Sequence, residues 1–174
     1  MKTKYWNALI FNRHALSQME AFESRDRRIS AVVSCFCTLA SLACVAAWAI
    51  WKILPGLWAF LVGMAQIVQI IWPTTTASKR LACSKYLLPA MRTLLNNMEN
   101  DWHKHRHSEE VMRDLLVCYN DRYIQLINTY TSDIDYPLND RMANRVETES
   151  ANYFRSRFGI EIWKEDLDAE QQNE

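Results

Sequence analysis

The chain has 174 residues, enough for one ordinary domain or for a membrane module joined to a second module. Its 20 basic and 20 acidic residues cancel, but basic residues gather at both ends of a long apolar segment. This distribution favours a membrane over nucleic acid as the partner. Only three glycines and four prolines are present, and strand-type alternation is hard to find. Both features predict an all-helical protein.

The first element that we expect is an amphipathic cytosolic helix within residues 1–29. Its apolar stripe includes Leu9, Leu16 and Met19, which recur at helical spacing. The opposite face is not strongly basic, so we favour packing of this helix against other cytosolic helices. Binding of the helix to the membrane surface is the alternative.

Two uncharged runs follow, at residues 30–51 and 54–72, and only a short link containing Lys52 separates them. About 20 residues are needed for a helix to cross the hydrocarbon core. The two runs therefore predict a transmembrane hairpin over residues 30–72, and a buried hairpin of a soluble protein is the alternative. Because the basic residues flank the outer ends of the two runs, the positive-inside rule places both termini in the cytoplasm.

Both predicted spans carry small or polar residues at helical spacing, which form a seam along each helix. These candidates for interhelical contacts or for the lining of a pore are Ser34, Thr38, Ser41, Gly63, Gln66 and Gln69. The two glutamines either hold helices together or line a water-filled path through an oligomer. Since two helices cannot enclose a channel, a pore would require several copies of the chain.

Residues 73–159 predict a cytosolic helical domain. After Pro73, either the threonines of TTTASKR cap a new helix or the second span continues with a kink. The helix that follows, to about His105, contains Pro89, which we expect to bend it near Lys85. Its heptad-like stripe predicts a coiled-coil interface of a homo-oligomer, a tetramer or larger. That stripe consists of Leu87, Met91, Leu94, Met98 and Trp102.

Two shorter helices complete this domain. One begins at Ser108, a plausible N-cap followed by two glutamates. The other runs from about Asn139 to Phe158 and is stopped by Gly159. Residues 160–174 form an acidic tail with few apolar residues, which we expect to be mobile.

No motif in the sequence supplies a catalytic set, a phosphate-binding loop or a nucleotide fingerprint. His103 and His107 would share a helical face, but no cysteine or carboxylate has matching spacing, so a solvated basic turn is favoured over a metal site. Arg141 and Arg145 share a face that could contact an anionic ligand, although a solvated face is the simpler interpretation. We therefore predict no enzyme, no metal and no cofactor, and a membrane enzyme is the least favoured hypothesis.

The order of these elements resembles the SLATT family of bacterial two-transmembrane effector domains. The resemblance is carried by ESRDRR before the first span, the paired spans, NNMENDWHKH at the end of the long helix, and YIQLINTYTSDIDYP before the last helix. It implies an effector that oligomerises and permeabilises the bacterial inner membrane in a nucleotide-signalled antiphage system. It also implies a nucleotide second messenger or a nucleotide-sensing protein as a partner. A non-conducting membrane anchor or scaffold, whose cytosolic helices recruit a partner protein, is the alternative.

Overall fold

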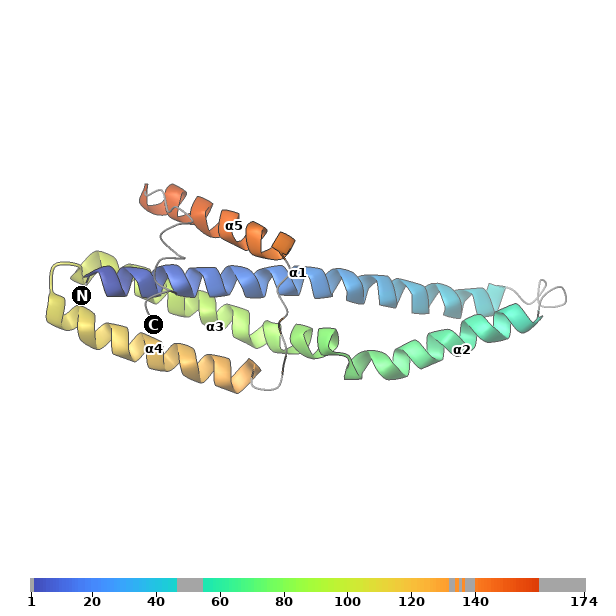
Figure 1. Ribbon diagram of the computed structural model, residues 1–174. Coiled ribbons are helices and arrows are strands. Elements are labelled where there is room, and N and C mark those ends of the chain that lie inside the picture. Colours follow the sequence, from blue (N-terminus) through green and yellow to red (C-terminus); the bar gives the residue numbers. More distant parts are fainter. Residues whose placement is uncertain (1, 47–54, 132–133, 135, 137–139, 160–174) are drawn as a thin grey trace. The chain divides into compact units, whose positions relative to one another are not determined.

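The computed structural model describes residues 2–46, 55–131, 134, 136 and 140–159. It contains helices α1 (Lys2–Ala46), α2 (Pro55–Ile71), α3 (Thr76–His105), α4 (Glu109–Thr131) and α5 (Asp140–Phe158), with a 3-10 turn, η2 (Trp72–Thr74), between α2 and α3 (Figure 1). The described residues include no strand, which confirms the predicted all-α class. The expected link around Lys52 and the expected acidic tail lie outside the described residues.

The chain divides into two compact units. The bundle unit comprises residues 1–21 and 85–174, and the hairpin unit comprises residues 22–84. α1 has no break at residue 29, where we expected one element to end and the next to begin. The physical reason is that residues 2–46 contain neither glycine nor proline, so nothing in the sequence interrupts the helix.

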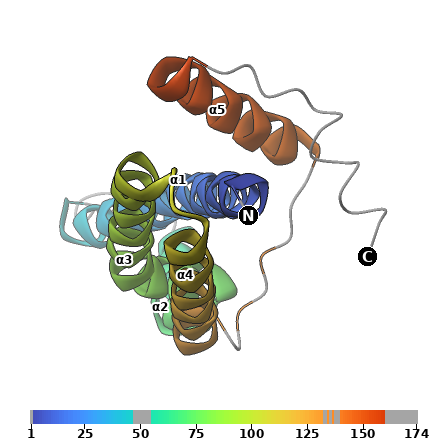
Figure 2. The same ribbon diagram turned by 90° about the vertical axis from the view of Figure 1, so that its left-hand side faces the viewer.

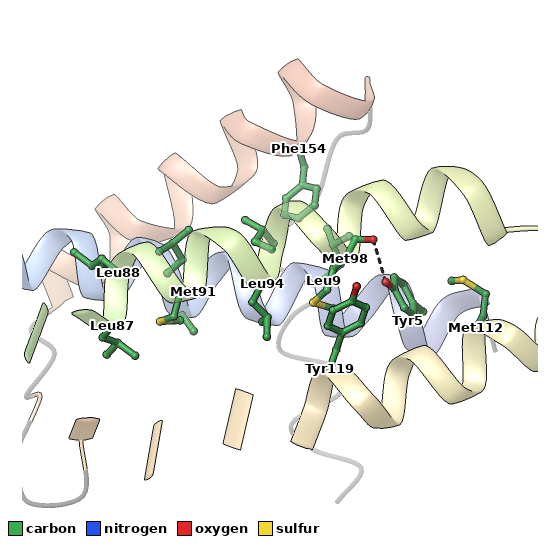
Figure 3. Packing of buried hydrophobic residues seen from close by; sticks show 13 residues of the cluster. Tyr5, Leu9, Leu87, Leu88, Met91, Leu94, Met98, Met112, Tyr119 and Phe154 are labelled. Atoms are coloured by element: carbon green, nitrogen blue, oxygen red, sulfur yellow. Dashed lines mark hydrogen bonds between the residues drawn. The ribbon is translucent and has the colours of Figure 1, made fainter. Parts of the chain in front are cut away.

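In the bundle unit, α1 and α3 pack against each other, and α4 and α5 lie on opposite sides of this pair (Figure 2). The core between them is formed by large apolar side chains from all four helices (Figure 3). At its centre, the hydroxyl of Tyr5 donates a hydrogen bond to the carbonyl oxygen of Met98 over 3.0 Å. The predicted apolar stripe of the N-terminal helix is therefore buried against the other helices, as we favoured.

The same core contains the heptad-like stripe of the long helix. Leu87, Met91, Leu94 and Met98 are each at most 3% exposed, and Trp102 stacks on Tyr5 with ring centroids 5.9 Å apart. The stripe is thus buried in a core that it shares with α1, α4 and α5 of the same chain, and its role as the interface of a homo-oligomer stays a prediction. Heptad spacing identifies a face that must be buried, but it does not tell whether the covering helix belongs to the same chain.

The junction after Pro73 follows the first of the two alternatives, in which a threonine caps a new helix. The hydroxyl oxygen of Thr75 accepts a hydrogen bond from the backbone N–H of Ser78 over 3.3 Å, and α3 starts at Thr76. α3 then continues through Pro89 without ending. Among the described residues, none of the helices taken singly has the length and apolarity to cross a bilayer, whereas one pair bent by 49°, Ala59–Thr74 with Thr76–His105, meets that criterion by length and composition.

The ends of the two shorter helices lie where the sequence predicted them. The carbonyl oxygen of Ser108 accepts the first helical hydrogen bond of α4, from the N–H of Met112 over 3.2 Å, which places Ser108 at the N-cap. α5 ends at Phe158, and Gly159 adopts a positive φ of 68° while its N–H bonds to the carbonyl of Arg155. Glycine is favoured here because a Cβ would be strained in this left-handed conformation.

Candidate functional site

The surface of the hairpin unit is formed by large apolar side chains. They occupy both α1 and α2, and each is between 39% and 74% exposed. The set is Ile29, Val32, Phe36, Leu39, Leu42, Leu57, Phe60, Met64, Ile67, Ile70 and Ile71. So many exposed large apolar side chains in one unit are unusual for a protein in water and indicate contact with lipid or another protein.

Small residues fill the contact between α1 and α2, which run antiparallel (Figure 1). Cys37 and Ala65 are both buried there, and the Cys37 thiol lies 3.9 Å from the carbonyl oxygen of Ala65. Gly63, predicted as a point of close approach, does not serve that purpose within one chain, because a Cβ built on it would meet nothing within 4 Å. The space beside Gly63 is therefore open.

A groove of about 530 Å³ lies between α1 and the end of α2. Its lining residues are Ser30, Val33, Ser34, Cys37, Thr38, Ser41, Gln69 and Trp72. The structure thus brings together four of the six residues proposed from the two spans: Ser34, Thr38, Ser41 and Gln69. Gly63 and Gln66 are not among the lining residues.

Two of the four hydroxyls that line this groove donate hydrogen bonds to the backbone of their own helix. Thr38 donates a hydrogen bond to the carbonyl oxygen of Ser34, and Ser41 donates one to that of Cys37, both over 2.8 Å. Their protons are thereby satisfied, so these oxygens face the groove as hydrogen-bond acceptors. An amide such as that of Gln69 supplies the complementary donors.

The two glutamines have different surroundings, although we expected both amides to point the same way. Both side chains are exposed, but Gln69 lines the groove and Gln66 does not. Three residues advance an α-helix by about 300°, which leaves roughly 60° between the two side chains. Among the described residues, neither side chain has a hydrogen-bond partner.

An ion pair between α1 and α3 was missed by the sequence analysis. The carboxylate of Asp26 is fully buried, and the Nε atom of Arg80 lies 2.6 Å from its Oδ2. We had counted Arg80 only as one of the basic residues that flank the second span. The available signal was an aspartate between the arginines of ESRDRR, since an acid requires a partner when it is buried.

A second buried acid, Glu99, lies in the bundle unit. It accepts a hydrogen bond from the hydroxyl of Tyr153 and lies 3.4 Å from the Nε of Arg157. Burial, together with the bond to Glu99, raises the pKa of Tyr153 to about 12. The guanidinium of Arg13 lies over the same ring, 4.2 Å from its centroid. These polar contacts hold α5 against α1 and α3.

The weaker candidate sites are not brought together. α3 ends at His105, so His103, which stacks on Phe158, does not share a helix with His107. No group of three potential metal ligands occurs in the part of the chain that the structure describes. Arg145 is paired with Glu149 of its own helix, and Arg141 is exposed.

Comparison of the chain with protein-family models, with curated proteins and with solved structures gives no match. The resemblance to SLATT domains therefore stays a prediction from the sequence.

Proposed function

We propose that this protein inserts its hairpin unit into a membrane and that several copies together permeabilise the bilayer. The observation that carries the proposal is the arrangement of side chains in this unit. Its large apolar side chains point outward from both helices, while hydroxyls and an amide line a groove between them. An apolar surface of this kind suits hydrocarbon, and a groove lined by hydroxyls and an amide suits water or a polar partner.

Assembly of several copies is supported by Gln66. This amide has no hydrogen-bond partner among the described residues and is exposed on a surface that is otherwise apolar. An unpaired amide in hydrocarbon costs several kcal/mol, so a second copy that supplies a partner lowers the free energy of the assembly. The open space beside Gly63 leaves room for a helix of that copy to approach. We therefore place the contacts of the proposed oligomer, a tetramer or larger, in the hairpin unit.

The proposed orientation has both termini in the cytoplasm of a bacterial cell, because the basic residues flank the outer ends of the apolar runs. The role in antiphage defence, with a nucleotide messenger or nucleotide-sensing partner, rests on the resemblance to SLATT effectors. A reporter that is active only in the periplasm, fused after Glu174, should be silent. Activity of this reporter would contradict the orientation.

The test of permeabilisation uses the full chain reconstituted into vesicles that contain a fluorescent dye. We expect the parent to release the dye and Gln69→Leu to lose most of that release, because the change removes the amide from the groove. Gln66→Leu should instead weaken assembly, measured by crosslinking in the membrane. Ile67→Leu is the matched control, since it changes an exposed apolar side chain of α2 and should leave both readouts unchanged.

The outcomes separate the candidate functions. Release by the parent and by Ile67→Leu, but not by Gln69→Leu, would support a polar path through the groove. A chain that stays in the membrane after alkaline extraction, yet releases no dye, would favour the non-conducting anchor or scaffold. A chain that is extracted completely would contradict the membrane proposal itself.

A further inference from the structure

The hairpin unit contains a buried ion pair between residues that are far apart in the sequence. The Nε and Nη2 atoms of Arg80 donate hydrogen bonds to Oδ2 and Oδ1 of Asp26 over 2.6 and 3.2 Å. The Arg80 side chain is 9% exposed and that of Asp26 is fully buried. Two parallel bonds between a guanidinium and a carboxylate fix the orientation of both groups as well as their distance.

Neighbouring side chains hold this pair in place. The Nε of Arg25 lies 3.4 Å from Oδ1 of Asp26, so that two arginines face one carboxylate. The guanidinium carbons of Arg25 and Arg80 lie 5.2 and 5.8 Å from the centre of the buried ring of Phe22. The ring and the second arginine restrict the positions that the carboxylate can take.

The pair closes the open end of the helical hairpin. Asp26 precedes Ile29, the first of the exposed apolar side chains of the hairpin unit, and Arg80 follows Thr75, which caps α3 after the bend. The pair therefore joins the two segments through which the chain enters and leaves the hairpin. Between this end and the link at the other end, the described contact of α1 with α2 involves the small side chains of Cys37 and Ala65.

Small and apolar contacts between helices do little to define rotation or sliding, because many arrangements bury similar areas. A shift of α1 by one residue would rotate its side chains by about 100° and turn Ser34 and Thr38 away from the groove. A buried ion pair opposes such a shift, since any other register leaves a charge buried without its partner. Specification of register is the best-attested use of buried polar pairs.

We propose that Asp26 and Arg80 are positioning residues that set the register of α1 against α2 and α3. The register that they enforce brings the hydroxyl seam of α1 opposite Gln69 and so forms the polar groove. The register is a property of the folded hairpin and does not depend on permeabilisation. Its consequence for dye release does rest on the proposed function, and the two readouts are therefore measured separately.

The register is tested with a disulfide between Cys37 and a cysteine introduced by Ala65→Cys, in a full chain whose other four cysteines are changed to serine. The Cys37 thiol lies 3.9 Å from the backbone carbonyl oxygen of residue 65, so the two positions are neighbours and we expect the disulfide to form on oxidation in detergent. In that background, Asp26→Asn should lower the disulfide yield by about tenfold, because it removes the carboxylate charge that faces the buried Arg80. Arg80→Lys should give an intermediate yield, since lysine keeps the positive charge but cannot donate two parallel hydrogen bonds to the carboxylate.

The control is a second ion pair between the same two helices. Arg92 and Glu20 pair over 2.8 Å, but the Arg92 side chain is 56% exposed. Arg92→Gln should leave the disulfide yield and dye release unchanged, because an exposed pair contributes little to stability. The double variant Asp26→Arg with Arg80→Asp restores the opposite charges and should recover most of the yield.

Each outcome decides the proposal. A parental disulfide yield in Asp26→Asn would overturn it, as would equal losses in Asp26→Asn and Arg92→Gln. If Asp26→Asn loses its helical circular dichroism, the double variant decides. A helical double variant that forms the disulfide supports the proposal, and a helical one that does not form it contradicts it. A parent chain that forms the disulfide but releases no dye would contradict only the proposed function.

Discussion

The two units of this chain place large and small side chains in opposite ways. In the bundle unit, large side chains such as Tyr5, Met98 and Phe154 are fully buried. In the hairpin unit, large side chains such as Val32 and Phe60 are more than 60% exposed, and the described contact between α1 and α2 is made by small residues. The buried ring of Phe22, beside the ion pair at the start of this unit, is an exception. α1 contributes to both arrangements along its length.

This difference separates two ways of holding helices together. In water, burial of large apolar side chains stabilises a bundle because their surface is removed from the solvent. In hydrocarbon that driving force between helices is absent, and close packing of small residues with polar contacts replaces it. The contrast between the units is what we expect if the proposed membrane function is correct, and it can be tested by substitutions in matched positions.

The largest effect should come from removing a buried ring of the bundle. Phe154→Ala should lower the free energy of unfolding of the bundle unit by about 3–5 kcal/mol, because the lost apolar burial is compounded by a cavity. Denaturant unfolding, followed by the fluorescence of the bundle tryptophans, measures this change. Phe60→Ala in the hairpin unit, where the ring is exposed, should leave the same transition unchanged. Equal losses in both variants would remove the distinction between the units.

A charged residue introduced on the exposed surface of each unit should have a smaller effect than the loss of a buried ring. Here the hairpin unit should be the more sensitive of the two. Leu39→Asp should cost about 2.5–3.5 kcal/mol of insertion free energy if this exposed side chain faces hydrocarbon. Val117→Asp, on the exposed face of α4, should change stability by no more than about 0.5 kcal/mol. The fraction of each variant that stays in membranes after alkaline extraction measures the difference. Full retention of Leu39→Asp would argue against a lipid-facing surface.

Loss of a single buried hydrogen bond should have an intermediate effect within the bundle. Tyr153→Phe removes the hydroxyl that donates to buried Glu99 and should lower the free energy of unfolding by about 1.5–3 kcal/mol. Tyr86→Phe is the matched control, because Tyr86 is exposed and contributes a ring stacked on Tyr130. A Tyr153→Phe variant as stable as the control would show that this hydroxyl does not fasten α5.

The smallest effect that we predict is a dependence of bundle stability on pH. Burial lowers the pKa of His14 below its ordinary value of 6.5, and the nearby Glu147 opposes this shift only in part. The neutral imidazole is therefore favoured in the folded state, so this contribution to stability is present above pH 6.5 and is lost as the pH falls toward the lowered pKa.

The melting temperature of the bundle should accordingly decrease between about pH 7.5 and about pH 5.5, and His14→Gln should show a weaker decrease. Thermal unfolding followed by circular dichroism at the two pH values measures this difference. An identical decrease in the parent and in His14→Gln would assign the effect to other groups.

Local sequence signals predicted the ends of helices well. Ser108, Gly159 and the threonines after Pro73 each act through hydrogen bonds or backbone angles within a few residues, so their effects can be read from the chain alone. The small polar seam of α1 was also predicted from its spacing, and the structure places Ser34, Thr38 and Ser41 in the groove. Spacing alone could not separate Gln69 from Gln66, because that distinction depends on where α1 lies beside α2.

The sequence by itself determined that the chain is helical, where α4 begins and α5 ends, and which residues form apolar and polar stripes, because propensity and periodicity are local properties. Only the tertiary structure decided which surface covers each stripe. It showed that the chain itself buries the stripe of Leu87 to Met98, and that Asp26 finds its partner in Arg80. Both outcomes depend on contacts between residues far apart in the chain, and such pairings leave no periodic signal in a single sequence.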